Sequence, residues 1–345
     1  MLVILYTKTM LTSGSTSPER LVSHQTLPVK IDCEMGDILF CKKNGFTFSV
    51  NSFSREADDE PYQTLVLDRK SIFKKGINYA LKNNIDKLEV VLDLTEEELA
   101  LLKHIPLKEL TLRGNENNID ISIINEFKTL EYFCCDSVVH GEIDLLNLQK
   151  LKGLRYDAKC LDIINLENSI GLKELGIHNY KRKELMSFGN SNIEKFFIHQ
   201  STITNLDALA NCKSLKKVTV EYNRFLNSID GIKASINSLE CLELRNCKHF
   251  ANYGILRLLG DLKNLYLCNC GDMENTSFFT ELKNLEYGYI DINILDGNVD
   301  LLMQMPIIFK NYRHFNRKNN LKIEVIMNDG NYLVRNKQIL YKISD

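Results

Sequence analysis

The side chains most suited to chemistry recur at a fixed interval along the chain. Asp136, Asp157, His178, His199 and Glu221 follow one another at steps of 21 or 22 residues. Carboxylates and imidazoles bind metal ions and transfer protons, so this column could form a metal site or an acidic, histidine-rich contact surface. Ligands set in a row on stacked strands do not readily enclose an ion. We therefore expect no metal site and no cofactor, and we favour the contact surface.

Ten cysteines add a second candidate chemistry, because Cys134-Cys135 and Cys268-x-Cys270 resemble redox or metal-binding pairs. In the repeat described below, Cys135 and Cys270 point inward while Cys134 and Cys268 point outward. The members of each pair should therefore diverge, which predicts structural thiols in a reducing cytosol. The sequence has no nucleophile elbow, phosphate-binding loop, dinucleotide fingerprint or HExxH motif. We expect no catalytic residues and no enzyme activity.

Charge and hydropathy exclude two further classes of partner. The 345 residues hold 43 Lys and Arg against 45 Asp and Glu, a net charge of −2, without the basic excess typical of a nucleic-acid binder. No apolar run approaches the ~18–20 residues of a membrane span. The apolar stretch Leu2–Tyr6 is short, and Lys8 follows it instead of preceding it, so we expect no secretory signal and a cytoplasmic location.

The elements that would position these side chains come from an internal repeat. Leu107–Leu112, Leu239–Leu244 and Leu262–Leu267 each follow L-x-x-L-x-L, and at every copy all three template positions are apolar or aromatic. Asn115, Asn223, Cys247 and Cys270 stand at the position that completes the leucine-rich-repeat signature L-x-x-L-x-L-x-x-N/C. Each copy predicts one short strand whose template residues enter a core shared between stacked coils. The ten copies begin at Ile85, Leu107, Leu130, Leu151, Leu172, Ile193, Leu215, Leu239, Leu262 and Leu282.

The pattern predicts a mainly-β or α/β solenoid, a leucine-rich-repeat horseshoe of about ten coils with a parallel concave sheet and β-hairpin caps at both ends. The apolar residues of Ile203–Leu209, spaced by three, suit a 3₁₀ segment on the convex side. We divide the chain into a partly disordered segment 1–34, an N-terminal cap 35–84, repeats 85–308 and a C-terminal β-meander cap 309–345.

Turn and strand signals define the caps. In the N-terminal cap, Asp37–Val50 predicts a hairpin that turns at Asn44-Gly45, followed by a strand at Thr64–Leu67 and a helix at Ser71–Leu81. In the C-terminal cap, Phe309–His314 predicts a degenerate strand, and Lys322–Val334 predicts a hairpin that turns at Asp329-Gly330. Gln338–Ile343 adds a final strand, and the meander should cover the last coil.

Outward-facing positions of the repeat predict the binding surface. Exposed aromatic and arginine side chains are typical of protein interfaces, and a concave solenoid face is a common place for them. We expect the face to bind a protein, with Phe197, Tyr222, Tyr266 and Tyr289 as apolar anchors and Arg155 and Arg245 as charged ones. The predicted partner-binding residues are Arg113, Tyr132, Asp136, Arg155, Asp157, His178, Phe197, His199, Glu221, Tyr222, Arg245, Tyr266 and Tyr289.

Over about residues 85–308 the sequence resembles the short repeats of bacterial internalin-type leucine-rich-repeat proteins. The resemblance implies the fold and a protein partner. Cytosolic bacterial proteins of this kind resemble immunity proteins that neutralise toxins, which is the first functional hypothesis. An effector that binds a host protein, with residues 1–34 as its secretion segment, is the alternative. An enzyme or metal protein built on the His178 and His199 column is the third class.

Overall fold

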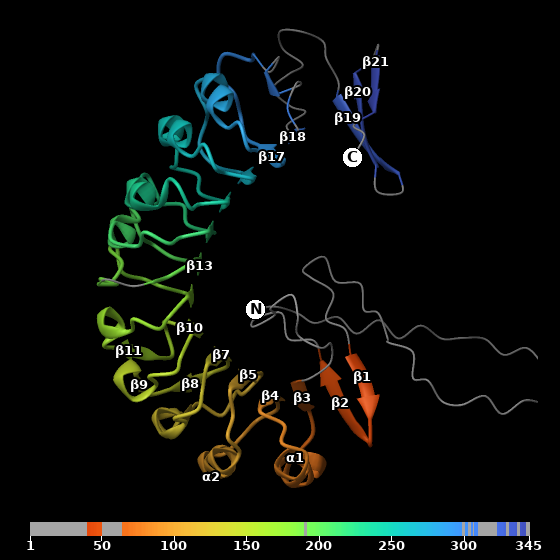
Figure 1. Cartoon of the computed structure of the whole chain (residues 1–345), viewed down its shortest axis with the longest axis vertical. Helices are drawn as coiled ribbons and strands as arrows, with labels where there is room; N and C mark the ends of the chain where they lie inside the picture. Colours follow the sequence, from red (N-terminus) through yellow and green to blue (C-terminus); the bar gives the residue numbers. More distant parts are fainter. Residues whose placement is uncertain are drawn as a thin grey trace, which may run out of the picture.

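A single large sheet runs through the chain. The computed structural model describes residues 40–49, 64–189, 192–298, 301–302, 305 and 307–309, and strands at 323–328, 331–336 and 339–342. The segment 1–34, expected to be partly disordered, lies outside the described residues. Fourteen strands form the main sheet in chain order, and every neighbouring pair from β3 to β18 is parallel. These strands line the inner side of an arc (Figure 1).

The repeat template sets the register of these strands. Leu110 pairs with Phe133, and Leu242 pairs with Leu265, so residues at the same template position stack on one another. Leu110, Leu175 and Leu265 are all buried, and each such side chain contributes on the order of 1.5–3 kcal/mol relative to exposure. The parallel strands are β3 (Thr64–Leu67), β4 (Lys87–Val91), β5 (Glu109–Arg113), β7 (Tyr132–Asp136), β10 (Gly153–Asp157), β12 (Glu174–His178), β13 (Lys195–His199), β14 (Lys217–Glu221), β15 (Cys241–Arg245), β16 (Asn264–Cys268), β17 (Tyr287–Asp291) and β18 (Ile307–Phe309).

Short helical segments and strand pairs form the outer side of the arc. Helix α1 (Lys70–Lys82) buries Phe73, Ile77 and Ala80 along one face. Helix α2 (Glu96–Leu101) begins with a capping box between Thr95 and Glu98. Later repeats use 3₁₀ helices, including the one expected within Ile203–Leu209, which spans Asp207–Leu209. The remaining outer elements are η1 (Leu102–His104), η2 (Ser122–Glu126), η3 (Leu145–Asn147), η4 (Leu166–Asn168), η5 (Asp207–Leu209), η6 (Asp230–Ser235), η7 (Tyr253–Leu258), η8 (Ser277–Glu281), and the paired strands β6 (Ile119–Asp120) with β8 (Val139–His140) and β9 (Glu142–Asp144) with β11 (Asp162–Ile164).

Antiparallel strands stand at both ends of the described chain. Strands β1 (Phe40–Lys43) and β2 (Phe46–Ser49) pair around Asn44 and Gly45, whose φ angles of 52° and 81° are those of a two-residue hairpin turn. Strand β2 then pairs antiparallel with β3. At the other end, β19 (Ile323–Asn328), β20 (Asn331–Asn336) and β21 (Ile339–Lys342) form an antiparallel three-stranded sheet. The expected turn at Asp329-Gly330 and residues 310–314 of the degenerate strand lie outside the described residues.

The last copy of the repeat begins three residues later than expected. Strand β17 pairs Leu265 with Gly288 and Leu267 with Ile290, so the copy starts at Leu285 and not at Leu282. Tyr287, expected to point into the core, is half-buried, and its ring lies 5.3 Å from that of Tyr266. The expectation was wrong because the inward position of this strand holds a glycine. Ile307 of the next strand fills that space, and its Cγ1 would lie 2.6 Å from a Cβ at Gly288.

Two further columns of residues follow the strands. Asn223 donates its side-chain amide to the Ile203 carbonyl 2.9 Å away, and Cys247 donates its thiol to the Val220 carbonyl at 3.6 Å, so both satisfy backbone of the preceding coil. The first residue after several strands is left-handed, with φ between 50° and 71°, and its N–H usually donates to the next strand. This left-handed column consists of Gly114, Asn179, Gln200, Tyr222, Asn246 and Asn269.

Charged residues precede ten consecutive strands, and each after the first donates its backbone N–H to the carbonyl of the residue before it in the column. Opposite charges form ion pairs between neighbouring coils, for example 2.8 Å between Lys108 and Asp86 and 2.6 Å between Lys216 and Glu194. Exposed pairs of this kind contribute about 0–1 kcal/mol each. This charge ladder consists of Asp86, Lys108, Glu131, Lys152, Lys173, Glu194, Lys216, Glu240, Lys263 and Glu286.

Candidate functional site

The column of outward residues that contains Glu89 and Phe197 is covered at its N-terminal strands and more open from β10 onward. Glu89, Thr111 and Cys134 face outward but are buried. Glu89 accepts a hydrogen bond from Ser49 at 3.0 Å and an ion pair from Arg113 at 3.0 Å, so Arg113 is held by its own sheet. From β10 onward, Arg155, Phe197 and Tyr266 of this column are half-exposed, while Thr219 and Glu243 are buried. In this column, therefore, a partner can reach aromatic and arginine side chains only from β10 onward.

An aromatic cluster occupies that middle part. The rings of His178 and Phe197 lie 5.2 Å apart, and those of His178 and His199 lie 5.4 Å apart. Tyr222 meets His199 edge-on at 5.2 Å and is 56% exposed. We call these four residues the concave cluster. Their rings come from successive strands because parallel pairing places His178 beside His199 and His199 beside Glu221.

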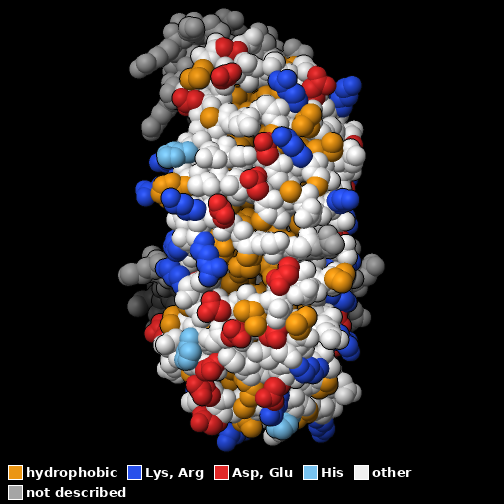
Figure 2. All heavy atoms as spheres, turned by 90° about the vertical axis from the view of Figure 1, so that its left-hand side faces the viewer, with side chains coloured by type: hydrophobic (Ala, Val, Ile, Leu, Met, Phe, Trp, Pro, Cys, Tyr) orange, Lys and Arg blue, Asp and Glu red, His pale blue; other side chains and the backbone are white. Residues whose placement is uncertain are grey.

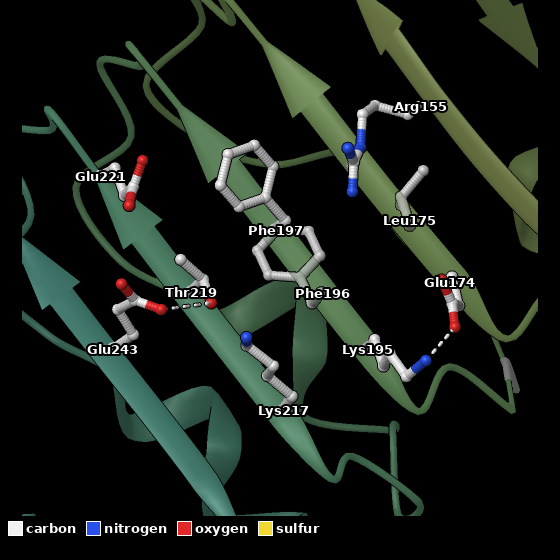
Figure 3. Close-up of a pocket in the computed structure, with 11 residues that line it drawn as sticks. Arg155, Glu174, Leu175, Lys195, Phe196, Phe197, Lys217, Thr219, Glu221 and Glu243 are labelled. Atoms are coloured by element: carbon white, nitrogen blue, oxygen red, sulfur yellow. Dashed lines mark hydrogen bonds and ion pairs between the residues drawn. The ribbon is translucent and has the colours of Figure 1, made fainter. Parts of the chain in front are cut away.

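A hollow of about 360 Å³ adjoins the concave cluster. It forms because small residues, Gly176 and Thr219, stand on either side of Phe197 in the same column. The Arg155 side chain extends across β12 toward Phe197, with its guanidinium carbon 5.6 Å from the ring centre (Figure 3). A Cβ at Gly176 would lie 2.9 Å from Arg155 Cγ, so a side chain at this position would displace Arg155. The hollow is therefore an open depression with a cation–π pair at its wall.

Ion pairs surround the hollow. Glu174 pairs with Lys195, and Glu243 accepts a hydrogen bond from the Thr219 hydroxyl at 3.5 Å (Figure 3). Arg245 pairs with Glu243 and lies 3.7 Å from Glu221. The positive charges around the hollow are therefore largely matched by carboxylates of the same face.

A second aromatic group lies beyond β14. The Arg245 guanidinium carbon is 5.8 Å from the ring centre of Tyr266, and Tyr266 contacts Tyr287. Tyr289 pairs with Tyr266 in the sheet and is half-buried. Together with the concave cluster, these rings extend the aromatic surface over strands β12 to β17.

Burial shifts two ionisable groups within this surface. The pKa of His178 lies below its ordinary value, chiefly because burial disfavours the imidazolium, while Asp136 acts in the opposite direction. The pKa of Glu221 lies above its ordinary value, first because of burial and second because of the neighbouring Glu243 carboxylate. The neutral forms of both side chains are therefore favoured on the folded face.

Four of the residues expected to bind a partner lie away from these clusters or have structural contacts. Arg113, Tyr132 and Asp136 lie on β5 and β7, away from these clusters, although Asp136 is exposed. Asp157 accepts hydrogen bonds from the Asn179 side chain and, at 2.8 Å, from the Lys159 backbone, so it shapes a turn. The expectation missed Gly176, Lys217, Glu243 and Tyr287, all of which line or adjoin the open part. For Gly176, Lys217 and Glu243 the outward template position was the available signal, whereas the template placed Tyr287 inward.

The cysteines and the histidine column form no clear reactive centre among the described residues. The nine described cysteines are free thiols. Burial raises the pKa of Cys134 to about 11, which disfavours the nucleophilic thiolate. In the parts of the chain that the structure describes, no three His, Cys, Asp or Glu side chains are placed to share a metal ion. Within the same parts, no helix has the length and apolar character needed to cross a bilayer.

One strand per repeat, stacked in parallel over a shared leucine core, identifies the architecture. The fold is a leucine-rich-repeat solenoid. No protein-family model matches the solenoid's sequence, and no curated protein matches it either.

Among solved structures, the solenoid is similar to an internalin, InlF, of Listeria monocytogenes, at 17% identity over 66% of this chain and 72% of that one, with a TM-score of 0.48. It is also similar to a leucine-rich-repeat protein of Leptospira interrogans, at 16% identity over 70% of this chain and 68% of that one, with a TM-score of 0.45. The leucine-rich-repeat domain of the type III effector XopL matches at 16% identity over 70% and 82% of the two chains, with a TM-score of 0.41. Likeness at these levels carries no argument about what the solenoid binds.

Proposed function

We propose that the solenoid is a non-enzymatic scaffold that binds a protein partner on the open part of its concave face. The observation that supports this most directly is the concave cluster. Four aromatic rings are in mutual contact beside a hollow, and Tyr222 is largely exposed. Exposed aromatic side chains next to arginine are the usual energetic centre of a protein interface.

The charge pattern supports a protein partner and disfavours a small anion at this hollow. Glu174, Glu221 and Glu243 stand among the cations that line it. A face with both signs of charge around an aromatic centre suits a surface with complementary charges of its own. A toxin neutralised by an immunity protein and a host protein bound by an effector both fit this description.

The test compares two double variants in affinity captures from extracts of the source cells and, separately, of host cells. Phe197→Ala with Tyr266→Ala removes the two central rings of the face. We expect it to fold normally and to weaken the partner by about 2 kcal/mol or more. The identity of the captured protein separates a toxin from a host protein.

The matched control is Leu146→Ala with Leu258→Ala. These leucines are 51% and 46% exposed and lie on the outer helices η3 and η7. Figure 2 shows the outer face, where charges of both signs are scattered among separate hydrophobic side chains. The control should bind as the wild type does. Equal binding by both double variants would refute the proposed face.

A further inference from the structure

A second hollow lies at the carboxyl ends of strands β12 to β16. Its volume is about 530 Å³. Because the strands are parallel, the residues that follow them all meet at this edge of the sheet. We call it the edge hollow. Its lining contains neither aspartate nor glutamate and consists of Lys181, Gln200, Ser201, Thr202, Tyr222, Arg224, Phe225, Asn246, Lys248 and Asn269.

Three cations of the edge hollow lack a counter-charge. Lys181, Arg224 and Lys248 form no ion pair with any carboxylate that the structure describes, unlike Arg113 and Arg245 of the concave face. Lys181 donates instead to the Gln200 carbonyl at 3.1 Å, and Arg224 lies 4.8 Å from the ring centre of Phe225. Three like charges held around one depression create a local positive potential in a chain whose net charge is −2.

A buried hydroxyl also lacks a partner at this place. Ser201 lines the edge hollow and is 4% exposed. Its Oγ has no hydrogen-bond partner among the described residues. A buried polar group left without a partner costs about 1–3 kcal/mol, so such groups in folded proteins usually indicate a missing acceptor or donor.

Two exposed aromatic rings complete the edge hollow. Tyr222 is 56% exposed and Phe225 is 37% exposed. Tyr222 has a φ of 52°, a left-handed conformation that a bulky residue rarely adopts, at a column position otherwise held by Asn, Gln or Gly. Its ring also contacts His199 of the concave cluster. The edge hollow is therefore continuous with the proposed binding face.

We propose that the edge hollow binds an acidic segment of the protein partner. Carboxylates of that segment pair with Lys181, Arg224 and Lys248, and an apolar or aromatic side chain packs against Tyr222 and Phe225. This inference rests on the proposed function, since it names the chemistry of part of the same partner. A nucleic acid is disfavoured because three cations on a chain with a net negative charge neutralise few phosphates.

The experiment uses a fluorescein-labelled random copolymer of glutamate and tyrosine as the probe, and the full chain as the receptor. Fluorescence anisotropy gives the dissociation constant. The charge-reversal variant is Lys181→Glu with Arg224→Glu and Lys248→Glu. The matched control is Lys75→Glu with Lys150→Glu and Lys283→Glu, which changes the net charge equally at exposed positions outside the hollow. Circular dichroism verifies that both variants fold.

We expect the wild type and the control to bind the copolymer alike, and the charge-reversal variant to bind at least about tenfold more weakly. An equal loss in both variants, or no binding by the wild type, overturns the inference. Tighter binding of a single-stranded oligothymidine than of the copolymer overturns it in favour of a nucleic acid. Phe197→Ala with Tyr266→Ala should keep its affinity for the copolymer. The copolymer assay therefore tests the edge hollow alone, and a failure of the concave-face proposal is recognised separately.

Discussion

Replacing Tyr222 with asparagine separates the stability of the solenoid from its binding. A left-handed backbone at a residue other than glycine costs about 1–3 kcal/mol, and asparagine tolerates it better than most. Three other members of the same column are asparagine. Loss of the ring contact with His199 removes about 0.5–1.5 kcal/mol. The two effects are of opposite sign, so the free energy of unfolding of Tyr222→Asn should stay within about 1 kcal/mol of the wild type.

The comparison with Tyr222→Ala isolates the backbone effect. Alanine loses the same ring but keeps the left-handed strain, so it should be less stable than the asparagine variant by about 1 kcal/mol. Urea unfolding followed by circular dichroism measures this difference. Both variants should weaken the captured partner by about 2 kcal/mol, close to thirtyfold in dissociation constant.

Either of two results would refute the reasoning. If alanine and asparagine are equally stable, the left-handed backbone is not a source of strain at this position. If Tyr222→Asn binds the partner as tightly as the wild type does, then the exposed ring does not serve recognition. Capture with both variants at equal protein concentration distinguishes these results.

Two further predictions concern the pH dependence of the concave face and the close packing around two glycines. The pKa of His178 is lower in the folded protein than in the unfolded chain, so the unfolded chain binds the proton first as the pH falls. The stability that the neutral ring contributes is therefore present above the ordinary pKa of 6.5 and is lost below it. His178→Gln should therefore reduce the fall in Tm between about pH 7 and pH 5. Glu221→Gln should increase the fall in Tm as the pH approaches 4.5, because the folded state takes up the Glu221 proton before the unfolded chain does; an unchanged fall in both variants contradicts the assignment. Gly231→Ala places a Cβ 1.8 Å from the Leu206 carbonyl oxygen, which is backbone and cannot move aside, and should destabilise the fold by about 3 kcal/mol in urea. Gly176→Ala meets only the flexible Arg155 side chain and should leave stability within about 1 kcal/mol while weakening the partner, so equal destabilisation by the two alanines would count against the close approaches described here.

The solenoid was predictable because burial imposes the same demand on every coil. Each short coil must turn three apolar side chains inward. Leu107, Leu110 and Leu112 do so in one coil, and Leu262, Leu265 and Leu267 do so in another. The register of the last repeat could not be predicted in the same way. Gly288 occupies an inward position with no side chain, because Ile307 reaches into its place from β18. A template that looks for apolar side chains cannot detect a space filled from a neighbouring coil.

The sequence predicted which residues share a column of the candidate site, but not which of those residues are exposed. Alternation along a strand places Thr219, Phe197 and Cys134 on the same face. Alternation cannot show that Thr219 and Cys134 are buried while Phe197 is half-exposed. The exposure of each residue depends on whether a long neighbouring side chain, such as that of Arg155, covers it. The left-handed backbone of Tyr222 was also not foreseen, although the asparagines at the same position of other repeats were a usable signal.

The charge ladder has a consequence for how many repeats such a chain can gain or lose. Its signs alternate from Glu194 through Glu286, so removal of one coil in this region would bring two like charges into contact, whereas removal of two would restore opposite neighbours. Changes in length by pairs of coils are therefore electrostatically neutral, and changes by single coils are not. Lys152 and Lys173 are adjacent in the ladder and carry the same sign, so the alternation changes phase between β10 and β12.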